Sequence, residues 1–253
     1  MTQRLEGKRI IVIGSATGIG AATVRRLVEE GARVCAADIR LEPAQALVEE
    51  VGNGAFAVQV DIADEASVNA AVAKAVEGLG GLDGAHVNAA DLRIIFQDSN
   101  ALDVDLAVFD HTIGVNLRGH LLCTRAVLPH LLANKGGAIV YTSSGSARGG
   151  EPERPCYAMS KGGLEALSRH VASRWGREGI TSNVVAPGFT MTQEMQAGGQ
   201  VPQAVIDHFL TTGRSFRVGQ SEDQAGVAAM LLSDDARWIN GQVINVNGGA
   251  LFF

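Results

Sequence analysis

The chain has 253 residues, 46% of them hydrophobic, with 31 glycines and a formal charge of −6, which suits one α/β domain spanning 1–253 and disfavours a nucleic-acid binder. Its three cysteines form no C-x-x-C pair, its histidines lack metal-ligand spacing, and no apolar run reaches the roughly 20 residues of a membrane span. Since the first residues also lack a signal segment, we expect a cytoplasmic protein with reduced thiols, no metal and no membrane partner.

The chain begins with a predicted strand, a glycine turn and a helix. Residues 8–13 are a β-branched run, followed by Gly14, Thr17, Gly18, Ile19 and Gly20 and then by apolar residues at helical spacing. Glycines at such a turn let the backbone approach a pyrophosphate, and the helix N-terminus offers N–H groups to an anion. The turn is therefore a candidate dinucleotide site, although a purely structural turn has the same pattern.

The second predicted strand, residues 33–37, ends in Asp38. A carboxylate there accepts hydrogen bonds from the adenosine ribose hydroxyls and repels a 2′-phosphate, which favours NAD over NADP. Arg40 leaves the alternative open, because a guanidinium tolerates a phosphate.

Two further strands are predicted at residues 55–60 and 85–88. The first is followed by Asp61 and Ile62, of which Asp61 is placed to meet the adenine edge, and the second leads to Asn88 and Ala89. The alternation of strands and helices predicts a Rossmann-like, doubly wound parallel sheet with helices on both faces. A ligand is expected at the carboxyl ends of the strands.

Tyr157 and Lys161 are four residues apart, so they share one face of a predicted helix. An ammonium there favours the phenolate, which makes Tyr157 a candidate acid/base group. Ser144, thirteen positions upstream, adds a hydroxyl for the same substrate oxygen. Alone, the Tyr-x-x-x-Lys pair also fits an ordinary amphipathic helix.

Together these motifs resemble the short-chain dehydrogenase/reductase family over residues 7–249. The matching positions are Gly14, Gly18, Gly20, Asn88-Ala89, Asn116, Ser144, Tyr157, Lys161, Pro187-Gly188, Thr190, Thr192, Asn240-Gly241 and Val246-Asn247-Gly248-Gly249. Two departures stand out. Ala90 replaces a glycine that usually lies close to the cofactor, and Ser221 replaces a usual proline, where we expect a serine N-cap.

The resemblance implies an NAD-dependent enzyme that moves a hydride between nicotinamide and a secondary alcohol or ketone. Tyr157 would take the hydroxyl proton, and Ser144 would stabilise charge on the same oxygen. Lys161 would lower the Tyr157 pKa and hold the nicotinamide ribose, while Asn116 would hold a water linking Lys161 to solvent. Pro187, Gly188, Thr190 and Thr192 resemble the stretch beside the nicotinamide.

A homotetramer is implied as well, built from the helices near 104–131 and 156–177 and the last strand. The apolar tail 250–253 supports it.

Residues 189–217 are the expected lid, with Gly198-Gly199 and Gly213 as hinge candidates. Met191 and Met195 in the lid predict a medium-sized, mostly apolar substrate, and Ile94 to Phe96 would add a second wall. Ser146 and Arg154 also face the expected substrate position, so a polar hydroxy-acid or sugar-like substrate stays open. A non-catalytic dinucleotide sensor or scaffold remains another alternative. The enoyl reductase branch is disfavoured, because it separates its Tyr and Lys by six residues and this chain by three.

Overall fold

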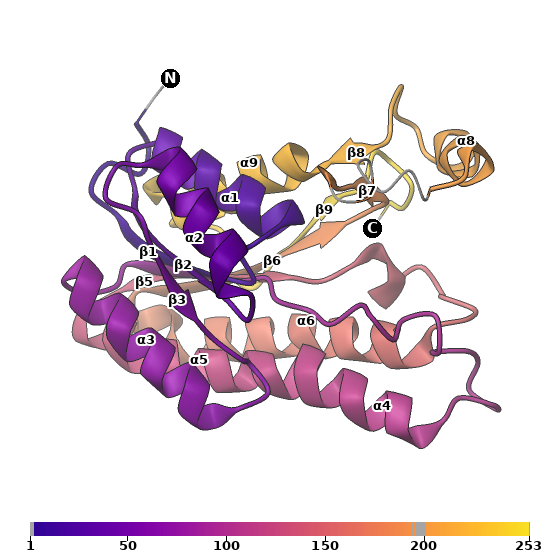
Figure 1. The fold of residues 1–253 in the computed structure, drawn as a ribbon, viewed down its shortest axis with the longest axis horizontal. Coiled ribbons are helices and arrows are strands. Elements are labelled where there is room, and N and C mark those ends of the chain that lie inside the picture. Colours follow the sequence, from indigo (N-terminus) through magenta and orange to yellow (C-terminus); the bar gives the residue numbers. More distant parts are fainter. Residues whose placement is uncertain (1–2, 194, 196–200, 253) are drawn as a thin grey trace.

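A computed structural model of the chain describes residues 3–193, 195 and 201–252. It contains one seven-stranded parallel sheet in the order β3-β2-β1-β4-β5-β6-β9, which confirms the predicted doubly wound α/β fold (Figure 1). The strands of this sheet are β1 (Arg9–Ile13), β2 (Arg33–Asp38), β3 (Phe56–Gln59), β4 (Gly84–Val87), β5 (Gly137–Thr142), β6 (Ile180–Pro187) and β9 (Val243–Val246).

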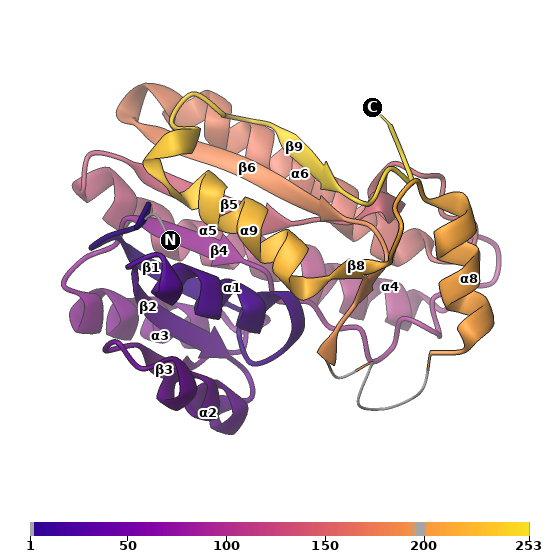
Figure 2. The same cartoon turned by 90° about the horizontal axis from the view of Figure 1, so that it is seen from above.

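Helices cover both faces of the sheet. Helices α1, α2 and α9 lie on one face of the sheet, and α3, α5 and α6 lie on the other (Figures 1 and 2). Helix α4 precedes α5 and extends its line beyond the sheet. The helices are α1 (Gly18–Glu29), α2 (Leu41–Val51), α3 (Glu65–Leu79), α4 (Leu106–Ile113), α5 (Gly119–Ala133), α6 (Pro155–Trp175), α8 (Gln203–Thr212) and α9 (Ser221–Leu232).

The sequence of β1 explains this layering. Ile11 and Ile13 point into the core beneath α3 and α5, whereas Ile10 and Val12 point into the core beneath α1 and α9. Side chains alternate between the two faces of a strand, so a strand buried on both faces needs a continuous apolar run. The alternation in β1 therefore determines which helices pack on each face of the sheet.

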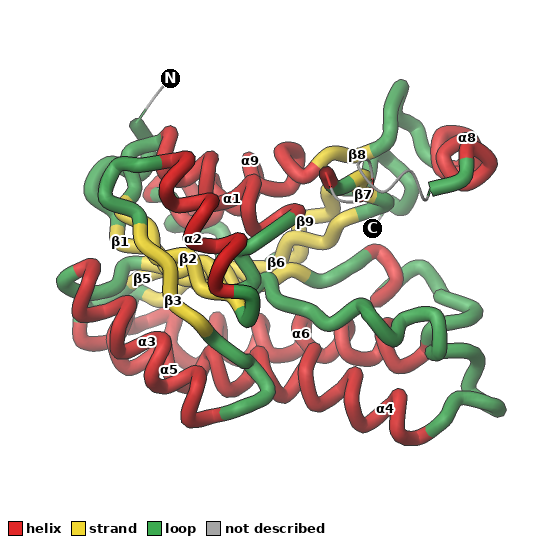
Figure 3. The backbone as a smooth tube through the Cα atoms, in the orientation of Figure 1, coloured by secondary structure: helices red, strands yellow, loops and turns green. Residues whose placement is uncertain are grey.

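A small two-stranded sheet extends the fold beyond the ends of β6 and β9. Its strands, β7 (Thr190–Met191) and β8 (Gly219–Gln220), lie next to α8 (Figure 3). Helix α8 falls within the segment expected to be a lid. The hinge candidates Gly198 and Gly199 and the terminal Phe253 lie outside the described residues.

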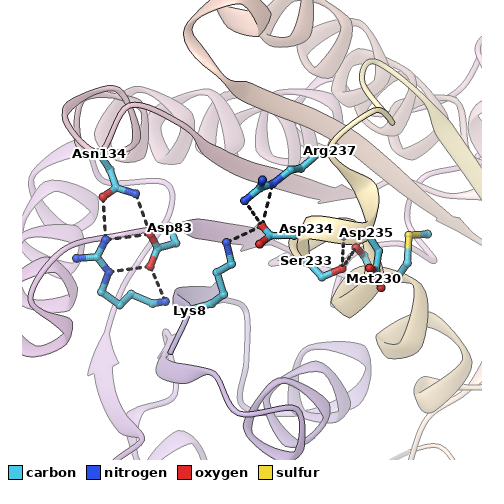
Figure 4. A network of polar contacts seen from close by, with 9 residues as sticks. Lys8, Asp83, Asn134, Met230, Ser233, Asp234, Asp235 and Arg237 are labelled. Carbon is cyan, nitrogen blue, oxygen red and sulfur yellow. Dashed lines mark hydrogen bonds and ion pairs between the residues drawn. The ribbon is translucent and has the colours of Figure 1, made fainter. Parts of the chain in front are cut away.

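Ion pairs join the amino ends of the strands, at the opposite end from the predicted site. The Arg9 Nε atom lies 2.7 Å from Asp83, and Lys8 Nζ lies 2.7 Å from Asp234, which Arg237 also contacts (Figure 4). A hollow of about 750 Å³ lies beside them. Since these charges are already paired with one another, we assign the contacts a structural role.

One predicted helix start is wrong. Ser221 is the first residue of α9 and not its N-cap, which is Gln220. The Asp223 carboxylate accepts a hydrogen bond from the Gln220 backbone N–H at 2.8 Å, so this helix is capped by a different pair.

In the described part of the chain, no helix has the length and apolar character needed to cross a bilayer.

Candidate functional site

Most of the predicted site residues lie at the carboxyl ends of the strands or in the loops and helices that follow them. In chain order they are Gly14, Thr17, Gly18, Ile19, Gly20, Asp38, Asp61, Ile62, Asn88, Ala89, Asn116, Ser144, Ser146, Arg154, Tyr157, Lys161, Pro187, Gly188, Thr190, Met191, Thr192 and Met195. The described residues contain no cluster of three His, Cys, Asp or Glu side chains that could hold a metal.

The glycine turn between β1 and α1 has no room for a side chain at Gly14 or Gly20. Gly14 has φ +86°, and a Cβ on it would lie 2.4 Å from the Ala89 Cα, while a Cβ on Gly20 would lie 1.9 Å from the Gly14 carbonyl oxygen. Thr17 is the N-cap of α1 but its side chain makes no capping hydrogen bond. The first-turn N–H groups therefore lack a side-chain acceptor, and this arrangement fits a bound pyrophosphate.

Asp38, at the end of β2, is anchored beside this turn. Its Oδ2 accepts a hydrogen bond from Ala16 N at 2.9 Å and its Oδ1 accepts one from Arg40 N at 2.9 Å. The Arg40 guanidinium donates to Thr17 Oγ1 at 2.8 Å and lies 3.9 Å from the carboxylate. A carboxylate and a guanidinium thus stand together where the sequence predicts the adenosine ribose.

Asp61 and Ile62 follow β3. The Asp61 carboxylate accepts a hydrogen bond from Ala63 N at 2.9 Å, which holds it in a turn at the sheet edge. The Ile62 side chain is buried in the core between the sheet and α3. Only the backbone of Ile62 is thus placed to face a ligand.

Asn116 lies in a π-helical turn, Gly114–Arg118, that joins α4 to α5. The sequence predicted one uninterrupted helix, and this wider turn was missed although Gly114 and Gly119 bracket it, because isolated glycines are tolerated inside helices. The buried Asn116 Oδ1 accepts a hydrogen bond from Asp91 N at 2.8 Å, and its Nδ2 donates to Asp91 O at 3.3 Å. Asp91 in turn contacts His111 Nε2 at 3.0 Å. Asn116 therefore ties the π turn to the loop after β4.

The Tyr157 phenol, Ser144 and Lys161 converge. Ser144 hydrogen-bonds the Tyr157 hydroxyl, and the Lys161 Nζ lies 5.7 Å from the centre of the Tyr157 ring. Lys161 is 2% exposed, and its Nζ donates to the Thr142 carbonyl at the end of β5 at 2.9 Å. Thr142 belongs to this group although no sequence motif marked it.

The pKa of Tyr157 corrects one expectation. Burial raises this pKa above its ordinary value, and Glu151 adds to the rise, while the Ser144 hydrogen bond and the Arg154 charge oppose it. The net direction is therefore opposite to the predicted lowering. Burial also lowers the pKa of Lys161 to about 8, because its ammonium is enclosed by the fold.

A continuous chain of hydrogen bonds links the glycine turn to Lys161. Asn88 Nδ2 donates to the Gly14 carbonyl at 2.9 Å, and Asn88 Oδ1 accepts from Thr142 Oγ1 at 2.9 Å. The Thr142 carbonyl then accepts from Lys161. The neighbouring Ala90 is exposed, so its methyl group does not fill this space.

The expected substrate residues include both polar and apolar groups. Glu151 accepts hydrogen bonds from Arg154 at 2.8 Å and from Ser146 Oγ at 3.3 Å, and its side chain is only 10% exposed. Met191 is buried in β7. Phe96, which was expected to form a second wall, is 94% exposed and instead faces solvent.

The stretch expected beside the nicotinamide is folded tightly. A Cβ on Gly188 would lie 2.8 Å from the Asn247 Cα, so glycine is required where β6 passes β9. Thr190 Oγ1 donates to the Gly188 carbonyl at 3.1 Å, and Met195 N donates to Thr192 Oγ1 at 3.3 Å. Pro187 lies directly before this turn, at the end of β6.

Cys156, beside Tyr157, is fully buried, and burial raises the pKa of its thiol to about 11. It is therefore a packing residue and not a nucleophile.

Because the buried Lys161 ammonium is held less favourably than in the unfolded chain, we predict that Lys161→Met increases stability. At pH 7 the free energy of unfolding should rise by up to about 3 kcal/mol. The difference from wild type should shrink as the pH rises above about 8, where the folded-state lysine loses its proton. Denaturant unfolding of both proteins checks this, with the exposed Lys74→Met as a control. A Met variant less stable than wild type at pH 7 would contradict the assignment.

Comparisons with known proteins identify the family of this chain. Residues 14–250 match the family model described as "Enoyl-(Acyl carrier protein) reductase". A protein of Bradyrhizobium diazoefficiens, named "Probable short-chain type dehydrogenase/reductase", is 38% identical over 98% of this chain and 89% of its own length. Levodione reductase of Leifsonia aquatica is 32% identical over 98% of this chain and 96% of its own.

Among solved structures, a short-chain dehydrogenase of Burkholderia cenocepacia in complex with NADP has a TM-score of 0.87 at 35% identity, covering 98% of this chain and 99% of that chain. Both the family match and the relatives extend over nearly the whole sequence. The chain therefore belongs to the short-chain dehydrogenase/reductase family, whose members are oxidoreductases that bind a nicotinamide dinucleotide.

Proposed function

We propose that this protein is an NAD-preferring oxidoreductase that interconverts secondary alcohols and ketones, with Asn116, Ser144, Tyr157 and Lys161 as its catalytic residues. The observation that carries the proposal is the meeting of Ser144, the Tyr157 phenol and the buried Lys161 beside the glycine turn. A bound nicotinamide would supply the hydride acceptor or donor. Gly14, Thr17, Gly18, Ile19 and Gly20 would hold its pyrophosphate.

In this proposal Tyr157 takes the hydroxyl proton of the alcohol, and Ser144 donates a hydrogen bond to the same oxygen. Burial raises the Tyr157 pKa and so disfavours the phenolate that a base requires. In this proposal the positive charge of Lys161 offsets the effect of burial by favouring the Tyr157 phenolate. Its ammonium lies 5.7 Å from the centre of the phenol ring. Asn116 keeps the π turn beside this group by its two hydrogen bonds with Asp91.

A non-catalytic sensor would need the glycine turn but not this grouping of hydroxyl, phenol and ammonium. An enoyl reductase role, suggested by the description of the matching family model, fits poorly with the three residues between Tyr157 and Lys161.

We predict that Tyr157→Phe lowers the turnover rate by at least about 100-fold, because the phenol acts in proton transfer. The affinity for NADH should stay nearly unchanged. The measurement is the steady-state rate with a panel of secondary alcohols, together with NADH fluorescence titration. Tyr141→Phe is a matched control, since it changes the chain's other tyrosine, which lies in the core. A Tyr157→Phe variant that keeps more than about a tenth of the wild-type rate would show that another group is the base.

The preference for NAD rests on Asp38. Its carboxylate is fixed by Ala16 N and Arg40 N and would lie beside a 2′-phosphate. Two observations favour NADP instead. The Arg40 guanidinium is adjacent, and the Burkholderia relative has NADP bound. We weigh the carboxylate more heavily, because it is buried and anchored whereas the Arg40 side chain is 55% exposed.

We predict a higher kcat/KM with NAD+ than with NADP+. In Asp38→Ala the ratio of these two kcat/KM values should be smaller. Arg40→Ala tests the competing role, because it should weaken NADP+ use without changing NAD+ use. Equal kcat/KM values for the two cofactors in the wild-type protein would reject the NAD preference and assign Arg40 as the phosphate ligand.

For the substrate we propose a medium-sized, mostly apolar secondary alcohol or ketone, cyclic or aryl, with residues 189–217 as its lid. Met191, Met195 and the stacked rings of Phe189 and Phe209, whose centres are 4.2 Å apart, make this segment largely apolar. The relative that reduces levodione, by its name, agrees with this choice. A polar hydroxy-acid or sugar-like substrate is the second candidate, favoured by the Glu151–Arg154 pair and Ser146.

Comparing kcat/KM for cyclic or aryl secondary alcohols with that for hydroxy acids of similar size separates the two candidates. We predict preference for the apolar alcohols, and little effect of Arg154→Ala on them, because Arg154 is already paired with Glu151. Preference for the acids that is lost in Arg154→Ala would establish the polar alternative.

We also propose a homotetramer. Strand β9 forms one edge of the sheet, and Leu106 on α4, Leu121 on α5 and Met159 on α6 are 72%, 45% and 50% exposed. Apolar side chains on adjacent helices suit a subunit interface. Phe252, at 77% exposed, adds to this apolar surface.

Light scattering at micromolar concentration should give four times the chain mass of 26.4 kDa. Leu106→Glu with Met159→Glu should lower the measured mass, because both place charge on the proposed interface. A wild-type mass of a single chain would refute the tetramer.

A further inference from the structure

Helix α6, which carries Tyr157 and Lys161, lacks a local cap. Arg154 precedes it and makes no capping hydrogen bond with its side chain, and Pro155 has no N–H group. The N–H groups of Cys156 and Tyr157 therefore need another acceptor. Because Cys156 is fully buried, solvent does not supply one.

Asp98 supplies the acceptor from the loop between β4 and α4. Its Oδ2 accepts a hydrogen bond from Tyr157 N at 2.8 Å, and its Oδ1 accepts one from Cys156 N at 3.3 Å. The Asp98 residue is only 4% exposed. It does for α6 what the adjacent Asp64 and Asp105 do for α3 and α4, whose N–H groups they cap locally. A carboxylate at this end also interacts favourably with the helix dipole.

We propose that Asp98 is a positioning residue for Tyr157, which it holds by the backbone so that the phenol meets Ser144. Asp98 accepts its hydrogen bond from the Tyr157 peptide N–H and not from the phenol, so we assign it a role that acts through Tyr157 and not in proton transfer. Its loop also contains Asp91, which holds Asn116. The loop after β4 thus fixes two of the proposed catalytic residues. This inference rests on the proposed role of Tyr157 as acid/base.

The test compares Asp98→Ala and Asp98→Asn with Asp103→Ala, which changes an exposed carboxylate in the same loop. Displacing a reacting group slightly has large kinetic effects, so Asp98→Ala should lower kcat about tenfold or more with NADH affinity nearly unchanged. Asp98→Asn keeps one carbonyl acceptor and should recover part of the rate. Asp103→Ala should match wild type. Thermal unfolding shows which variants are folded. If Asp98→Ala does not fold, the kcat of Asp98→Asn tests the proposal instead.

A second readout needs no substrate. The chain has two tyrosines, and burial raises the pKa of Tyr141 far above its ordinary value, so phenolate absorbance that appears at lower pH reports Tyr157. Freeing the first turn of α6 should expose the Tyr157 phenol and move its titration midpoint down toward that of a free tyrosine. Tyr157→Phe serves as the blank, and Asp103→Ala should titrate like wild type.

Folded Asp98 variants with wild-type kcat and a wild-type titration midpoint would overturn the positioning role. The proposed function fails separately, if Tyr157→Phe itself remains active. In that case the titration still shows whether Asp98 positions the phenol.

Discussion

The site depends on one buried charge and the carbonyl that holds it. The Lys161 ammonium is 2% exposed and donates to the Thr142 carbonyl at 2.9 Å, and Thr142 is linked through Asn88 to the glycine turn at Gly14. Enclosing a charge is unfavourable unless it is paired, and burial lowers the pKa of Lys161 accordingly. The fold therefore accepts a less stable arrangement at a position where the ammonium lies 5.7 Å from the centre of the Tyr157 ring.

Parallel strand order makes this arrangement possible. Strands β1, β4 and β5 are neighbours in the sheet, so Gly14, Asn88 and Thr142 at their carboxyl ends lie in hydrogen-bond contact although far apart in the chain. The loop after β4 then holds the helical elements on the same side, through Asp91 to Asn116 and through Asp98 to Tyr157. One sheet edge thus joins a surface suited to an anion with a surface suited to proton transfer.

Much of the fold and the candidate site could be predicted from the sequence, because both depend on local patterns. The β-branched run before Gly14 specified a strand buried on both faces, and the four-residue spacing of Tyr157 and Lys161 specified a shared helix face. Contacts between distant residues left no such pattern. The only sign of the Asp98 cap was indirect: an arginine, Arg154, stands where a helix usually has Ser, Thr, Asp or Asn.

Two other features depend on packing and could not be read from spacing. The glycines that bracket the π turn around Asn116 do not by themselves distinguish it from a helix, and the contact of Asn116 with Asp91 is visible only in the folded chain. The direction of the Tyr157 pKa depends on how deeply the fold encloses the phenol, and this burial outweighs the Ser144 hydrogen bond and the Arg154 charge.

We propose that filling the dinucleotide site makes Tyr157 a base, since burial in the chain by itself raises its pKa. The most direct measurement is the phenolate titration of the wild-type protein with and without saturating NAD+, using Tyr157→Phe as the blank. We predict that NAD+ lowers the titration midpoint of Tyr157, because the positive ring adds to the charge of Lys161. A midpoint that NAD+ leaves unchanged, in a protein that binds the nucleotide, would contradict this account.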